Sequence, residues 1–198
     1  MARIVFRNST ELPDQRLFAL CCEGLNGWAT GTISLSVRYS RGADFSGTCY
    51  YADRRIYVNL GRHLTYPYTM TTNLARAITR GRYWHRPLYT IDLRDGCHLV
   101  VFIFMHELYH LLVKRAGRNT RQKESMCDRF AARFLVDRLG ATVRAPDGKP
   151  VPREVWDFQD LERFVAAARD RRVVPTSSRP RAAKSPTPCE GQLQLFSP

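Results

Sequence analysis

The segment FIFMHELYHLLVK, residues 102–114, constrains the fold of this chain more than any other stretch. It places His106, Glu107 and His110 within one of the most apolar runs of the sequence. Burying ionisable groups is costly unless something compensates them. On a helix, residues four apart lie on the same side, so the two imidazoles face one point and Glu107 leans over the same cleft. The segment therefore predicts a core helix that carries a polar site.

The spacing of these three residues is the HExxH pattern, in which one helix provides two zinc ligands and a general base. A single Zn²⁺ ion would compensate His106 and His110 directly, and Glu107 through a bound water. The alternative is a core helix with two hydrogen-bonded histidines, in which Glu107 would need a separate buried partner. We expect the metal site.

A catalytic zinc needs a third protein ligand and an open position for water. The remaining histidines all precede the motif, so the third ligand is expected to be an acid. Glu124 follows a loop long enough to reverse the chain, on the first turn of the next predicted helix. Asp128, one turn further on, is placed to orient a ligand imidazole through its other ring nitrogen. The alternative for Glu124 is an exposed first-turn acid favoured by the helix dipole.

The residue periodicity predicts an α+β fold. We expect an N-terminal helix near residues 10–25, a strand at 33–39, and a hairpin formed by SGTCYY and IYVNLG. Two helices follow, one from Gly96 to Ala116 with Asp95 as its cap, the other closed by Gly140. Between hairpin and helices, NLARAITR is a candidate short helix and LYTIDL a candidate strand. A last helix starts at Pro152.

These elements form one expected domain, residues 1–172, with a small antiparallel sheet. Residues 173–198 are rich in Pro, Ser and basic residues and predict a disordered tail. We expect that no segment approaches the length of a membrane span, and we expect no secretion signal. The six cysteines include no CxxC pair, which argues against a thiolate zinc site and against a disulfide framework. A cytoplasmic location is the simplest interpretation.

HELYH, a short loop and ESMCDRFA (residues 124–131) together resemble the ImmA/IrrE type of small gluzincin metallopeptidase. After its glutamate ligand, that family has a small residue, Asp or Asn, and Phe-Ala, at the positions of Cys127, Asp128, Phe130 and Ala131. The resemblance implies a zinc-dependent endopeptidase that acts on a protein substrate, with zinc held by His106, His110 and Glu124 and with Glu107 as general base.

The resemblance also implies a strand that borders the cleft and pairs with extended substrate. Its residues here are Ile56, Tyr57, Val58, Asn59 and Leu60. We expect a further donor to the oxyanion, for which Tyr57, His63, His98 and Tyr109 are unranked candidates.

The formal net charge of +13 predicts attraction to polyanions, most often DNA through non-specific electrostatics; the alternative is a solvated basic surface. Arg76, Arg80, Arg82 and Arg86 are interleaved with Tyr83 and Trp84. These residues form either a stacking and phosphate-binding surface or a solvated loop with one aromatic ring anchored in the core, the interpretation we favour from sequence.

The chain ends in QLQLF, in which Gln192, Leu193, Leu195 and Phe196 resemble the peptide by which many bacterial proteins dock on the replicative sliding clamp. The alternative is a terminal strand that packs on its own domain. Charge and tail together suggest a protease that acts near DNA on a repressor or a DNA-bound protein. Two other functions stay open: a non-catalytic DNA- or clamp-associated adaptor with a structural metal, and a mobile-element protease that acts on a partner repressor.

Overall fold

The computed structural model describes residues 3–28, 30–121 and 123–166. Its largest sheet has the strand order β1-β2-β4-β3, formed by β1 (Arg3–Asn8), β2 (Thr32–Tyr39), β4 (Arg55–Leu60) and β3 (Phe45–Tyr50). The α+β class is confirmed, and so is the hairpin, in which β3 and β4 pair antiparallel. The sheet is mixed rather than purely antiparallel, because β1, β2 and β4 run parallel.

Strand β1 is an element that the sequence analysis missed. It precedes helix α1 (Asp14–Leu25) and pairs in parallel with β2 after the helix has crossed over. In β2 buried and more exposed side chains alternate, with Ile33, Leu35 and Val37 fully buried. In β1 only Ile4 is buried. A half-exposed first strand carries too weak a period-2 signal to be recognised by pattern alone.

Helix α2 (Gly96–Arg115) is the core of the molecule. Asp95 caps it by accepting a hydrogen bond from the His98 backbone amide at 3.0 Å, as predicted. By length and composition this helix could cross a membrane, since one 18-residue window has a mean hydropathy of 1.5, so our expectation that no segment approaches such a span was wrong. However, 89% of that window is buried inside the protein, which is typical of a core helix of a globular protein.

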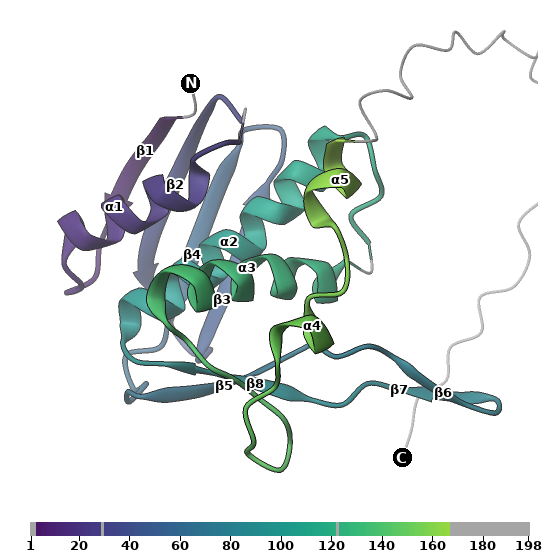
Figure 1. Cartoon of the computed structure of the whole chain (residues 1–198). Helices are drawn as coiled ribbons and strands as arrows, with labels where there is room; N and C mark the ends of the chain where they lie inside the picture. Colours follow the sequence, from purple (N-terminus) through teal and green to yellow (C-terminus); the bar gives the residue numbers. More distant parts are fainter. Residues whose placement is uncertain (1–2, 29, 122, 167–198) are drawn as a thin grey trace, which may run out of the picture.

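Helix α3 (Glu124–Leu139) packs along α2, and α1 also contacts α2 (Figure 1). Gly24 of α1 lies against the Met105 side chain of α2. Gly140 ends α3 in the left-handed conformation with φ of 64°, as predicted. The predicted last helix is instead two short ones, α4 (Arg153–Trp156) and α5 (Leu161–Ala166). Helix α4 ends before Asp157, whose backbone has φ −100° and ψ 61°, outside the helical region. Its carboxylate accepts hydrogen bonds from Arg133 and Arg153.

The segment between the hairpin and α2 forms a long β-ribbon that extends from the body of the molecule (Figure 1). Strands β5 (Tyr68–Thr72), β8 (Tyr89–Leu93) and β9 (Val143–Arg144) form one antiparallel sheet, and β6 (Ile78–Arg80) pairs with β7 (Tyr83–His85). The strand predicted in LYTIDL is confirmed. The short helix predicted in NLARAITR is wrong: residues 73–77 form no helix, and Ile78–Arg80 is strand β6. Asn73 itself is held by hydrogen bonds that its backbone and side-chain amides donate to Asp128.

Candidate metal centre

Helices α2 and α3 bring His106, His110 and Glu124 together. The Nε2 atom of His106 lies 3.2 Å from one carboxylate oxygen of Glu124, and the Nε2 atom of His110 lies 3.4 Å from the other. Both rings sit on one face of α2, one turn apart, and Glu124 opens the first turn of α3 opposite them. The structure therefore assembles the three side chains that the sequence analysis singled out as ligands.

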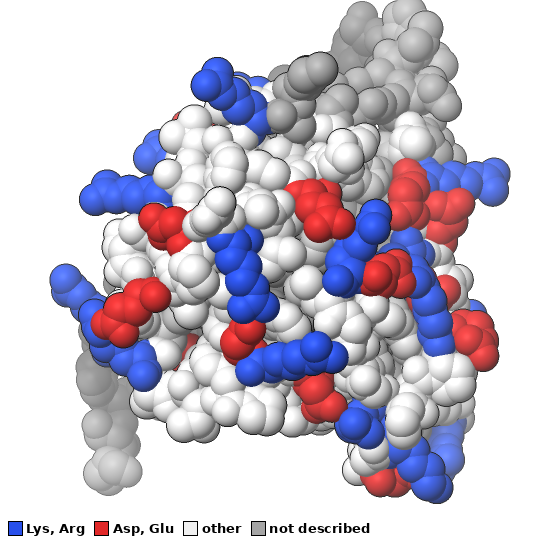
Figure 2. All heavy atoms as spheres, turned by 60° about the vertical axis from the view of Figure 1, so that its left-hand side comes forward, with Lys and Arg blue, Asp and Glu red and all other residues white. Residues whose placement is uncertain are grey.

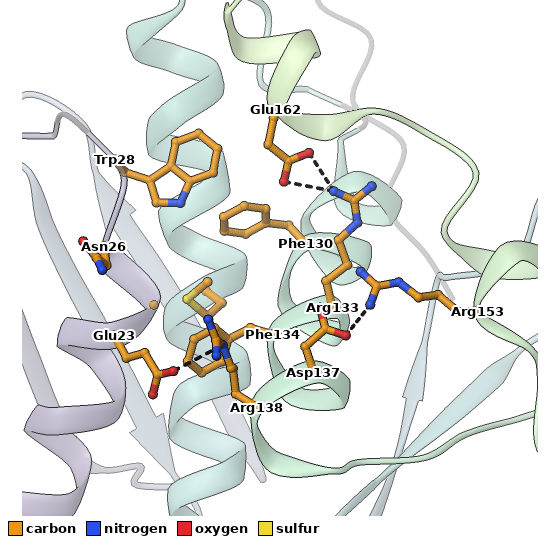
Figure 3. A pocket seen from close by; sticks show the side chains of 12 residues that line it. Glu23, Asn26, Trp28, Phe130, Arg133, Phe134, Asp137, Arg138, Arg153 and Glu162 are labelled. Carbon is orange, nitrogen blue, oxygen red and sulfur yellow. Dashed lines mark hydrogen bonds and ion pairs between the residues drawn. The ribbon is translucent and has the colours of Figure 1, made fainter.

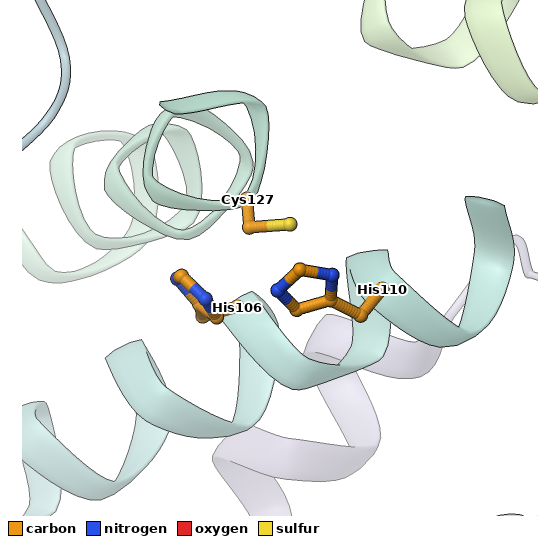
Figure 4. Close-up of side chains that lie close together, drawn as sticks. All are labelled: His106, His110 and Cys127. Carbon is orange, nitrogen blue, oxygen red and sulfur yellow. The ribbon is translucent and has the colours of Figure 1, made fainter. Parts of the chain in front are cut away.

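Cys127 is a fourth group at this site. Potential ligand atoms of His106, His110 and Cys127 all lie within 4.8 Å of one another (Figure 4). The cysteine spacing rule did not predict this arrangement, because it considers thiol pairs rather than one thiol that faces two imidazoles. Cys127 lies close to the two histidines because α3 packs against α2.

Asp128 holds His106 in place. The Nδ1 atom of His106 donates to the Asp128 carboxylate at 2.8 Å, which leaves Nε2 directed toward Glu124. The other carboxylate oxygen of Asp128 accepts from the backbone amide and the side-chain amide of Asn73, at 2.7 and 3.3 Å. Asn73 lies just after β5 and was missed, since no sequence signal connects it to a residue 55 positions later.

Glu107 lines a cavity of about 210 Å³ together with His106, Glu124 and Asp128. Glu107 makes no hydrogen bond or ion pair within the described residues, and its pKa is raised by burial and by the nearby Glu124 carboxylate. It lies against the edge of the sheet, where a Cβ atom on Gly47 would stand 2.4 Å from the Glu107 Oε1 atom. A carboxylate without a partner beside an accessible cavity is suited to proton transfer.

The electrostatics of the two histidines differ. Burial alone would lower the pKa of His106, but its hydrogen bonds to Asp128 and Glu124 outweigh this and raise the pKa to about 9. Burial and the neighbouring His106 lower the pKa of His110. The hydrogen bond to His106 lowers the pKa of Glu124 despite partial burial.

A metal ion fits this donor set. Zinc ligands lie about 2.0–2.3 Å from the ion, so donor atoms about 3–4 Å apart can share one. The described distances of 3.2 and 3.4 Å meet that requirement. The Nδ1 atom of buried His110 has no hydrogen-bond partner among the described residues. The polar contact of this ring is therefore the one that its Nε2 atom makes with Glu124. The site is thus compatible with a metal ion.

The strand Ile56–Leu60 does not present a free edge, which corrects our prediction for substrate pairing. This strand, β4, is paired with β2 on one side and β3 on the other, so its backbone groups are already used. Among the described strands, the edge belongs to β3, whose residues Phe45, Ser46 and Gly47 line the cavity. The hairpin itself is confirmed, but which of its strands lies at the edge depends on pairing with β2, which is distant in the sequence.

None of the four candidate oxyanion donors lines the cavity. Tyr109 donates its hydroxyl to the Leu161 carbonyl at 3.1 Å, and His63 donates to Asp44 at 2.8 Å. The ring of His98 accepts from the Arg94 amide near the start of α2, and Tyr57 packs against Tyr50 on the sheet. The cavity is instead lined by the polar side chains of Ser46, Thr71 and Asn73.

The predicted tail lies outside the described residues. This applies to the domain boundary at residue 172 and to the clamp-docking residues Gln192, Leu193, Leu195 and Phe196.

No protein-family model, curated protein or solved structure matched the chain in the three comparisons.

Proposed function

We propose that the chain is a zinc-dependent endopeptidase of the ImmA/IrrE-like gluzincin type. The observation that carries the proposal is the position of Glu107. Its carboxylate has no partner within the part of the chain that the structure describes, and it shares one cavity with His106 and Glu124. Beside it lies β3, an edge strand among the described strands. A site that only stabilised the fold would not need a base next to an accessible cavity.

Zinc is the proposed ion, with His106, His110 and Glu124 as ligands. Two imidazoles and one carboxylate are a typical catalytic zinc set, which also leaves a position open. When bound, the ion would polarise the scissile carbonyl and lower the pKa of a water molecule to about 7.

The protein's own groups then perform the remaining steps. The Glu107 carboxylate accepts the proton of the attacking water and passes it to the nitrogen of the leaving amine, so that the acid is a carboxylate again after each cycle. Asp128 keeps the His106 ring in position throughout. The unpaired edge of β3 forms main-chain hydrogen bonds with an extended substrate peptide, which would place the scissile bond over Glu107.

A second candidate is a non-catalytic adaptor with a structural metal. It is favoured by one observation, the proximity of Cys127 to both histidines. If Cys127 were a ligand in addition to Glu124, four protein groups would close the coordination sphere, as in structural zinc sites. Against this, burial and the neighbouring carboxylates of Glu124 and Asp128 raise the pKa of the Cys127 thiol and oppose the thiolate form that binds metal.

The test is metal analysis and proteolysis with purified variants. We expect Glu107→Gln to retain the metal and to lose cleavage of an unfolded casein substrate, with Glu154→Gln, an exposed acid of α4, as control. Normal cleavage by Glu107→Gln would show that the assigned base is wrong.

The ligand set is tested in the same way. Glu124→Ala should lose the metal and Cys127→Ala should retain it. Loss of the metal in both variants would establish four protein ligands and would favour the adaptor function. Loss in Cys127→Ala alone would show that Cys127, not Glu124, is the third ligand.

A protein substrate near DNA remains part of the proposal, supported by the net charge of +13. Docking on a sliding clamp through the C-terminal QLQLF is likewise proposed from the sequence alone. Equal recovery of purified clamp with the full chain and with a chain that lacks residues 190–198 would refute the docking.

A further inference from the structure

The β6–β7 pair, together with the flanking residues 76–77 and 86, forms an arm that continues the β5–β8 ribbon away from the body (Figure 1). All residues of its two strands are exposed, including Tyr83 at 83% and Trp84 at 69%. The prediction that one aromatic ring of this segment is anchored in the core is therefore wrong, because both rings are exposed. Adjacent strand residues point to opposite faces, so the arm presents one large aromatic ring on each face.

The arm is also strongly basic. The chain has no acidic residue between Asp53 and Asp92, and that stretch contains Arg54, Arg55, Arg62, Arg76, Arg80, Arg82 and Arg86. Arg80 lies directly across from Tyr83. No arginine from Arg76 to Arg86 forms an ion pair within the described ranges. Elsewhere the charges are mixed: on the face that lies to the left in Figure 1, basic and acidic side chains are interspersed (Figure 2).

An open groove of about 430 Å³ lies at the base of the arm. It is lined by four cationic side chains, those of Arg76, Arg86, Lys123 and Arg129, and by no carboxylate. The guanidinium carbons of Arg76 and Arg129 lie 4.0 and 4.4 Å from the ring centroid of Phe158, so one ring holds both cations close together. The first turn of α3 contributes Ser125 to the same groove.

Arg129 is a buried cation, only 2% exposed, and it forms no ion pair with a carboxylate of residues 3–28, 30–121 or 123–166. It donates to two neutral acceptors, the Leu74 carbonyl and the Gln159 side chain, and its Nε atom has no partner among the described residues. The Nε atom of Arg86 is likewise buried and unpartnered. Burial and the charge of Arg86 lower the pKa of Arg129 to about 10. A buried guanidinium without an ion pair is costly, and two buried Nε atoms without hydrogen-bond partners beside it favour an anion in the groove.

In another cavity, of about 260 Å³, each arginine forms an ion pair with a carboxylate. There Arg138 pairs with Glu23, Arg153 with Asp137, and Arg133 with Glu162 (Figure 3). Arginine-rich surface alone is therefore not what distinguishes the groove at the base of the arm. The difference is that, among the described residues, no carboxylate lines that groove and none forms an ion pair with its four cations.

We propose that the arm and this groove bind single-stranded nucleic acid, with a backbone phosphate in the groove and bases stacked on Tyr83 and Trp84. Arginines beside exposed rings are the combination that binds single strands, because each base offers a face for stacking while its phosphates attract the cations. A membrane surface suits the arm less, since Ile78 is its one large aliphatic side chain. Lys123 and Ser125 flank Glu124, so the bound strand lies beside the metal centre.

The proposal does not depend on peptidase activity and is tested by binding alone. Fluorescence anisotropy of a labelled oligothymidylate is measured with the full-length chain at several salt concentrations. We expect Trp84→Ala to weaken binding about ten-fold, the loss of one stacked base. Arg76→Gln/Arg86→Gln should weaken binding and reduce the slope of log affinity against log salt by about 1.4, since each lost phosphate contact contributes about 0.7.

The matched control is Arg3→Gln/Arg7→Gln, which removes the same charge from exposed positions of β1 at the opposite edge of the molecule (Figure 1). If this control weakens binding as much as the double variant at the arm, and Trp84→Ala has no effect, the attraction is diffuse and the proposal is wrong. Preference for a duplex of the same length, or Trp84-dependent binding of anionic vesicles without binding of the oligonucleotide, would also overturn it. Thermal melting confirms that each variant is folded.

Discussion

Replacing Asp128 by Asn tests whether the site is organised around His106. The Asp128 carboxylate, 6% exposed, accepts one hydrogen bond from His106 and two from Asn73. An asparagine has the same shape but a single acceptor oxygen and no charge, so it cannot serve both partners. Removal of such an outer carboxylate typically lowers metal affinity 10- to 100-fold, which corresponds to about 1.4–2.7 kcal/mol.

The assay is a zinc titration in competition with a chromophoric chelator at neutral pH. Asp44→Asn is the matched control, because Asp44 also accepts a hydrogen bond from a histidine, His63, at 2.8 Å, but on the exposed surface. We expect Asp44→Asn to bind zinc like the unmodified chain. If folded Asp128→Asn also does so, then the His106 ring does not need its carboxylate partner and the derived geometry of the site is wrong.

Two further predictions concern the cleft and its protons. Gly47→Ala should retain the metal, but its cleavage rate should fall at least about ten-fold, because the added Cβ atom would stand 2.4 Å from the Glu107 Oε1 atom. The control is Gly42→Ala, which adds a Cβ atom in open space and should cleave at the normal rate. In the metal-free protein, the pKa of His106 is about 9, so its contribution to stability is present below pH 6.5 and is lost as pH rises. In urea unfolding with a chelator present, the free energy of unfolding should fall by about 2 kcal/mol between pH 6.5 and pH 8.5. Bound zinc should abolish this pH dependence. A free energy of unfolding that does not change over this range would contradict the raised pKa.

Local sequence signals were sufficient for elements whose stability is local. Asp95 before an apolar run and Gly140 after a periodic one mark helix ends through backbone hydrogen bonds and a left-handed residue. The spacing of His106 and His110 likewise follows from the helical repeat alone. Glu124 could be selected because the chain reverses between two recognisable helices and no later histidine competes with it.

What the sequence by itself determined was thus the two helices of the site and the side chains that they carry. The tertiary structure decided everything that depends on pairing across long distances: that β3 rather than β4 forms the open edge, that Cys127 faces the histidines, and that Asn73 supports Asp128. The tertiary structure also left Trp84 exposed on an arm where the sequence suggested an anchor. The physical reason is that helix periodicity and caps involve residues within a turn or two of each other, whereas strand order and burial are set by packing between segments far apart in the chain.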